Sequence, residues 1–179
     1  RLLELGATAF VLDVKGSNVY FASAAPLATE LGLHRPMYDI ADVIKRAHER
    51  GFYVIGRYIS LKDALFSAQQ PDAQIRHPKN NRSIGSVWVD GSTQVTLDYN
   101  RQIMEDLVRT GIDEVNLDYI RYPTEYAQVS IGLSGKEKAD RIEPFITMAR
   151  EVIDRVNPGT KLGISSYAIL GWNYPVNLE

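Results

Sequence analysis

Asp118 is the residue whose surroundings most favour chemistry. It lies near the end of a short apolar run, residues 114–120, in which a period of two would place Asn116 and Asp118 on one face of a strand. The residues between them, and Tyr119, would then face the other way, toward covering helices. A carboxylate at the mouth of a partly desolvated cleft can act as nucleophile, as acid or base, or as stabiliser of an oxocarbenium-like transition state. Asp118 is therefore the principal candidate for catalysis.

Other side chains near the ends of neighbouring apolar runs could complete such a site. Asp13 and Asp63 are local candidates for a second carboxyl group that could act together with Asp118. Arg57 and Arg121 could bind a hydroxyl or an acidic group of a substrate, or could simply form a structural ion pair with Asp118. The set that we expect to bind substrate is Asp13, Arg57, Asp63, Trp88, Asn116, Arg121 and Tyr122, and further aromatic rings stand at Tyr58, Tyr126 and Trp172.

Composition and motifs argue against several other classes of function. The net charge of −2, with no Lys/Arg-rich run, makes nucleic acid an unexpected partner. The three histidines lie far apart and the chain has no cysteine, so no metal site is expected. No Gly-rich phosphate loop follows a strand-like run, and we expect no cofactor. No stretch approaches the roughly 20 apolar residues of a membrane span, and the compartment stays open.

The elements that must position these residues alternate between strand-like and helical patterns. Apolar, β-rich runs predict strands over residues 8–15, 52–61, 114–120 and 161–168. Apolar stripes at helical spacing predict helices over residues 40–47, 99–107 and 142–156. Four strands joined by three helical crossovers predict a parallel sheet with the strands adjacent in chain order. A barrel is the preferred architecture, and a small doubly wound sheet is the alternative.

One run also resembles a known family. Residues 114–123 are similar to the signature of a family of glycosyl hydrolase domains, in which an acidic residue, two or three strand residues, Asp-Tyr, an aliphatic residue, Arg, an aromatic residue and Pro follow in order. Residues 12–15, 53–57 and 61–63 agree with three further segments of that family. Leu61, however, replaces the usual Phe.

The resemblance implies a (β/α)₈ barrel in which one strand precedes those seen here. Asp118 would then end the fourth strand, where several retaining glycosidase barrels hold their nucleophile. The resemblance also implies a carbohydrate substrate, and it favours a secreted or extracytoplasmic location.

The sequence thus predicts a carbohydrate-active hydrolase. A complete barrel takes about 250 residues, so we expect residues 1–179 to form a single partial barrel of about four βα units, truncated at both ends. An uncovered strand edge in such a fragment would favour self-association. The alternatives are a non-catalytic glycan-binding barrel and an unrelated lyase or isomerase barrel for small molecules.

Overall fold

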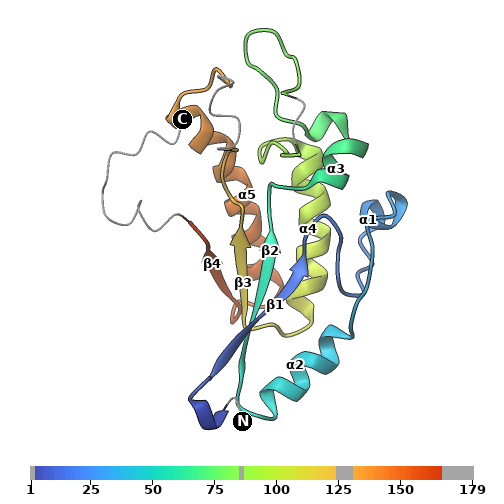
Figure 1. Ribbon diagram of the computed structural model, residues 1–179, viewed down its shortest axis with the longest axis vertical. Helices are drawn as coiled ribbons and strands as arrows, with labels where there is room; N and C mark the ends of the chain where they lie inside the picture. The colour runs from blue at the N-terminus through green and yellow to red at the C-terminus, as the bar shows by residue number, and fades with distance from the viewer. Residues whose placement is uncertain (1–2, 85–86, 124–130, 167–179) are drawn as a thin grey trace.

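The computed structural model describes residues 3–84, 87–123 and 131–166, and its centre is one parallel sheet (Figure 1). The strands are β1 (Ala9–Lys15), β2 (Tyr53–Ile59), β3 (Glu114–Asp118) and β4 (Lys161–Ile164). They lie in the order β1-β2-β3-β4, and each neighbouring pair is parallel. A doubly wound sheet reverses its strand order at a switch point, and this sheet does not. The predicted order is therefore confirmed, and the fold is that of a partial (β/α)₈ barrel.

Helices fill the crossovers between the strands. Asp39 and Thr93 are the N-caps of α2 and α4, and each accepts a hydrogen bond from a backbone N–H of the first turn. The last long helix, α5, begins seven residues before its predicted apolar stripe, because Ser134 and Glu137 form a capping box. The helical elements are η1 (Leu3–Leu5), α1 (Pro26–Glu30), α2 (Ile40–His48), α3 (Ala64–Gln69), η2 (Pro71–Ala73), α4 (Gln94–Arg109) and α5 (Gly135–Val156).

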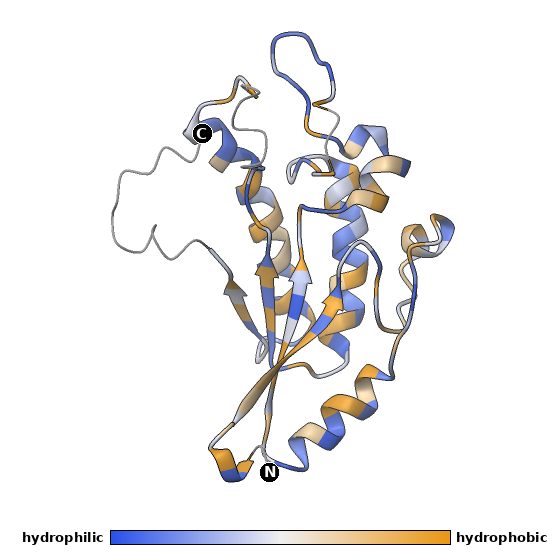
Figure 2. Cartoon of the chain, viewed as in Figure 1, coloured by the Kyte–Doolittle hydropathy of each residue, from blue (hydrophilic) through white to orange (hydrophobic). Residues whose placement is uncertain are grey.

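The two faces of the sheet differ sharply in exposure. On the face covered by α4 and α5, the side chains of Val54, Val115 and Leu117 are fully buried. On the opposite face, side chains such as Val11 remain exposed, and we call this the open face. Hydrophilic and hydrophobic bands alternate along the central strands in Figure 2, as a sheet with one covered face requires. In a complete barrel the open face would line the interior.

Two strand ends depart from the simple alternation. β3 stops at Asp118, two residues before its predicted end, because Tyr119 adopts a left-handed backbone with φ of 53°. In β1 the register with β2 shifts between Asp13 and Lys15. Because of this irregularity, the Lys15 side chain points to the helix-covered face of the sheet, where it is fully buried. Simple alternation would have placed it on the open face with Asp13.

No helix in the described part of the chain combines the length and the apolar character that a membrane crossing demands.

Candidate active site

The open face carries a bridged set of charges on three adjacent strands. Arg57 stands on β2, level with Asp13 on β1 and Asn116 on β3. Its Nε donates to Oδ2 of Asp118 at 2.8 Å, its Nη2 lies 2.7 Å from the same oxygen in an ion pair, and its Nη1 donates to Asp13 at 3.0 Å. The hydrogen bond to Asp13, followed by the contact with Asp118, raises the pKa of the Arg57 guanidinium. One cation thus holds two carboxylates, and we call Asp13, Arg57 and Asp118 the charge bridge.

The second oxygen of Asp118 is held by the backbone that follows it. The Tyr119 N–H donates to Oδ1 of Asp118 at 2.8 Å, while Arg57 occupies Oδ2. A left-handed tyrosine costs on the order of 1–2 kcal/mol, so neighbouring contacts must hold this turn. The Tyr119 ring lies 5.8 Å from the Trp88 ring, and the Lys62 ammonium stands over both. Asp118 is therefore fixed in orientation, and its donors match the ionised carboxylate.

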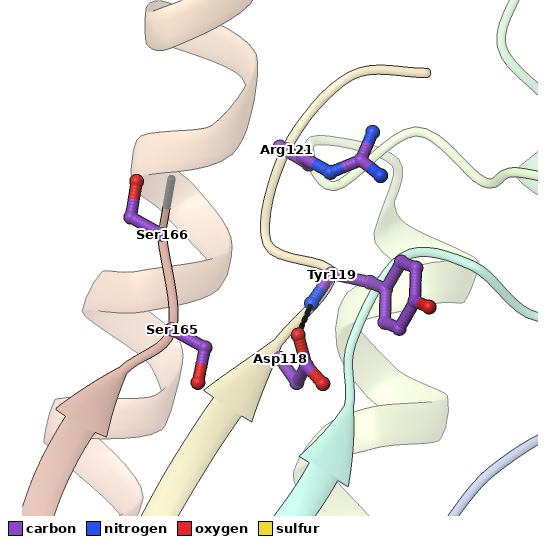
Figure 3. Close-up of a pocket in the computed structure, with 5 residues that line it drawn as sticks. All are labelled: Asp118, Tyr119, Arg121, Ser165 and Ser166. Atoms are coloured by element: carbon purple, nitrogen blue, oxygen red, sulfur yellow. Dashed lines mark hydrogen bonds between the residues drawn. The ribbon is translucent and has the colours of Figure 1, made fainter. Parts of the chain in front are cut away.

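A small cavity opens beside Asp118. It has a volume of about 210 Å³ and is lined by Asp118, Tyr119, Arg121, Ser165 and Ser166. Figure 3 shows the two serines on the β4 side and the other three residues on the β3 side. The cavity thus combines one carboxylate, one guanidinium and two hydroxyls, a set suited to a hydroxyl-rich ligand.

Two predicted site residues join the cavity through defined contacts. The Ser165 hydroxyl donates to Oδ1 of Asn116 at 2.8 Å, which fixes the Asn116 amide on the open face. The Arg121 guanidinium lies over the rings of Trp88, at 4.7 Å, and Tyr119, at 5.5 Å, and donates to the Tyr122 carbonyl. Arg121 is therefore oriented by flat aromatic surfaces beside the carboxylate of Asp118.

Three other residues that were predicted to bind substrate lie away from the surface that a ligand can reach. Asp63 is 1% exposed: it pairs with Lys15 at 2.8 Å and caps α3 through the Phe66 N–H. Trp88 is fully buried, so no sugar could stack on it, and Tyr122 is 8% exposed. Asp63, Trp88 and Tyr122 are therefore no longer candidates for substrate binding.

Of the remaining aromatic candidates, Tyr58 is the one that the structure describes, and it lies away from the open face. Tyr58 is fully buried and donates to Asn100 at 2.8 Å. Tyr126 and Trp172 lie outside the described residues.

Sequence reasoning missed three residues near the site. Ser165 could have been found by continuing the period of two along β4, which aligns it with Gly163 on the open face. The turn at Tyr119 and the burial of Lys15 have no signal in residue type, because both depend on contacts made across the fold.

Within the described ranges, no group of three or more His, Asp or Glu side chains is arranged to hold a metal ion.

Comparison with known proteins identifies one family model that covers nearly the whole chain. The profile of a family described as "Putative glycosyl hydrolase domain" matches residues 4–177. A hypothetical protein from Ruminiclostridium thermocellum has a similar crystal structure, with 27% identity and a TM-score of 0.72 over 92% of this chain and 86% of that one. A search of curated proteins finds no match.

More distant structures share the fold alone. An alpha-galactosidase from Lactobacillus brevis is 18% identical with a TM-score of 0.53, covering 91% of this chain and 23% of that one. A maltogenic alpha-amylase from Thermotoga neapolitana is 18% identical with a TM-score of 0.56, covering 93% and 39%. This chain therefore spans well under half the length of either enzyme.

Proposed function

The chain belongs to that glycosyl hydrolase domain family, and from this premise we propose that it hydrolyses glycosidic bonds with Asp118 as the principal catalytic carboxylate. The observation that carries the proposal is the charge bridge at the mouth of the sheet. It fixes one carboxylate beside a polar cavity, at the carboxyl ends of parallel strands, where barrel enzymes build their active sites.

The donors around Asp118 favour a role that uses the ionised carboxylate. Arg57 gives one hydrogen bond and a further ion-pair contact to one oxygen, and Tyr119 gives one hydrogen bond to the other; each contact becomes weaker if the group is protonated. An ionised carboxylate suits a nucleophile that attacks the anomeric carbon and forms a covalent glycosyl-enzyme. It suits a general acid poorly, so the proton for the leaving group comes from another residue.

Asp13 has a supporting role in this mechanism. It shares the Arg57 guanidinium with Asp118, at 3.0 Å, and its own side chain is 61% exposed. Asp13 therefore holds the Arg57 side chain across the open face, so that the Nε edge meets Asp118. Asn116 and Arg121, which flank the cavity, are the groups proposed to bind substrate hydroxyls.

Asp118→Asn tests the assignment because it keeps the shape and removes the charge. The wild-type protein and the variant are assayed on a panel of aryl glycosides and oligosaccharides, beside thermal unfolding and glycan binding. Turnover should fall on the order of 10³-fold or more, with little change in affinity. Asp154→Asn, which removes an exposed carboxylate from α5, is the control and should leave turnover unchanged.

Two results would contradict the proposal. Glycan binding by the wild-type protein with no turnover of any substrate would indicate a non-catalytic glycan-binding barrel. Turnover that survives Asp118→Asn, with a lowered melting temperature, would make Asp118 a structural partner of Arg57.

A further inference from the structure

A second, larger pocket lies outside the cavity at Asp118. Its volume is about 450 Å³, and it forms where the segment between β2 and α4 meets the first turns of α5. Both segments lie at the end of the molecule toward which the strands point (Figure 1). We call it the rim pocket, and its lining residues are Asp72, Gln74, Arg76, His77, Pro78, Asn81, Asp90, Ser92, Thr93 and Arg141.

One wall of the rim pocket is fixed by a nearly buried carboxylate. Asp90, whose side chain is 5% exposed, accepts from the Arg141 guanidinium at 2.7 Å. It also accepts from the backbone N–H of Ser92 at 3.0 Å and from its hydroxyl at 2.7 Å. A carboxylate held by three donors cannot reorient freely, so this wall is formed before any ligand arrives.

Another part of the lining is a loop whose two arms are joined by an isolated antiparallel bridge between Arg76 and Ser83. Arg76 donates to the carbonyls of Asn81 and Pro71, each at 3.1 Å. The His77 ring packs so closely on Gly132 that a Cβ added there would lie 2.9 Å from Nε2. Gly132 also has a φ of +72°, so both space and backbone conformation favour glycine. The loop is thereby seated against the segment that precedes α5.

The charges of the rim pocket are balanced internally. Arg141 pairs with Asp90, and Arg76 lies 3.9 Å from Asp72. The lining therefore offers hydrogen-bonding groups of both kinds without a net field that would select an ion. Pro78 is the one apolar side chain among the lining residues. Such a surface matches a neutral, hydroxyl-rich molecule.

The rim pocket is close enough to the catalytic end of β3 to hold part of the same ligand. Tyr122 follows Asp118 by four residues, a span of at most about 14 Å. Burial raises the pKa of Tyr122, and the charges of Asp90 and Arg141 act on it in opposite directions, so Tyr122 lies near both of these pocket residues.

We propose that the rim pocket binds a neutral sugar unit of the glycan at a distance from the bond that is cleaved. This inference rests on the proposed glycoside hydrolase function for its biological sense, but its binding test does not require turnover.

The test fills the pocket with Ser92→Trp. Calorimetry measures binding of malto- and α-galacto-oligosaccharides of six units, and hydrolysis is followed on the same oligosaccharides and on the matching aryl monoglycosides. The variant should bind the preferred hexasaccharide about tenfold more weakly and raise its KM similarly. KM and kcat for the aryl monoglycoside should stay the same, because that substrate does not reach the rim. Asp154→Trp, at the other end of α5 from Arg141, should change neither value.

The outcomes separate the two proposals. If Ser92→Trp binds the hexasaccharide more weakly but the wild-type protein hydrolyses no substrate, the rim-pocket proposal is supported and the hydrolase proposal is overturned. Hydrolysis by the wild-type protein, with hexasaccharide affinity unchanged in Ser92→Trp, would overturn the rim pocket alone. Absence of binding by every oligosaccharide, with intact folding, would also overturn it.

Discussion

Two charge clusters stand at the ends of the same strands and have opposite characters. Lys15 and Asp63 are 0% and 1% exposed and pair at 2.8 Å, and Lys15 also donates to the carbonyls of Gly16 and Ile59. The charge bridge is half open: the side chains of Arg57 and Asp13 are 37% and 61% exposed. The buried pair has no room for a ligand, whereas the charge bridge adjoins a cavity. Local charge alone therefore does not mark a site; access does.

A single irregularity in β1 separates the two clusters. Asp13 is level with Arg57, but the register shift places Lys15 level with Tyr58. Lys15 then points into the helix-covered side, where the Tyr58 and Tyr99 rings lie 5.3 and 5.4 Å from its ammonium. The register shift therefore places Lys15 on the helix-covered face and leaves Asp13 on the open face.

The largest effect is expected at the buried pair. Asp63→Asn should lower the free energy of unfolding by about 3–5 kcal/mol, because it leaves the Lys15 ammonium buried without its counter-ion. Urea unfolding measures the change. Adding Lys15→Met to Asp63→Asn should recover most of the loss, since no buried charge then remains. If Asp63→Asn lowers the free energy of unfolding by less than about 1 kcal/mol, water reaches the Lys15–Asp63 pair. The contrast between this pair and the charge bridge would then be wrong.

A smaller effect on stability, but a clear one on turnover, is expected at the charge bridge. Arg57→Met should change the free energy of unfolding by no more than about 1 kcal/mol, because half-exposed ion pairs contribute little. Turnover should fall on the order of 10²-fold, because Asp118 loses the preorganised guanidinium that holds it. Arg57→Lys keeps the positive charge but cannot present two nitrogens to Asp118, so its turnover should lie between those of Arg57→Met and the wild-type protein. A variant that unfolds readily yet keeps its turnover would place Arg57 with the scaffold.

The smallest effect concerns Tyr38, whose hydroxyl donates to the backbone carbonyl of Asp13. Burial, followed by the charges of Asp13 and Tyr20, raises the pKa of Tyr38 from its ordinary value of 10.0 to about 12. Above pH 10 the unfolded tyrosine loses its proton while the folded one keeps it, so stability contributed below pH 10 is lost as the pH rises to 12.

Tyr38→Phe isolates this contribution. Tyr58 and Tyr99, whose pKa values burial also raises, contribute to the alkaline loss in both proteins. Denaturant unfolding between pH 9 and 12 should therefore show a slightly steeper loss in the wild-type protein than in Tyr38→Phe. Parallel curves would mean that Tyr38 titrates as it does in the unfolded chain.

The sequence predicted the sheet well because its signals are local. Each strand is a short apolar run, and each long crossover helix has an apolar stripe and a capping residue, so order and direction follow. The end of β3 was predicted too late, because the left-handed turn at Tyr119 depends on Trp88 and Lys62, which a distant segment contributes. The start of α5 had a readable signal, the Ser134 and Glu137 capping box, which an apolar stripe alone does not include.

The site was predicted only in part, for a physical reason. Alternation correctly placed Asn116 and Asp118 on one face of β3, and strand neighbours placed Asp13 and Arg57 beside them. Asp63 and Trp88 follow a strand in the long segment after β2, and their burial depends on how that segment folds back. Tertiary packing of a loop has no periodic signature, so residue type suggested exposure where the fold provides none.

Trapping of a covalent intermediate tests the central claim, that Asp118 is the nucleophile, most directly. A fluorinated glycosyl fluoride of a sugar that the wild-type protein hydrolyses would form the glycosyl-enzyme faster than it is released, and mass spectrometry of proteolytic peptides would locate the label. The account predicts one sugar on the peptide that contains Asp118, and none in Asp118→Asn. A label on any other carboxylate, or full activity in Asp118→Asn, would contradict it.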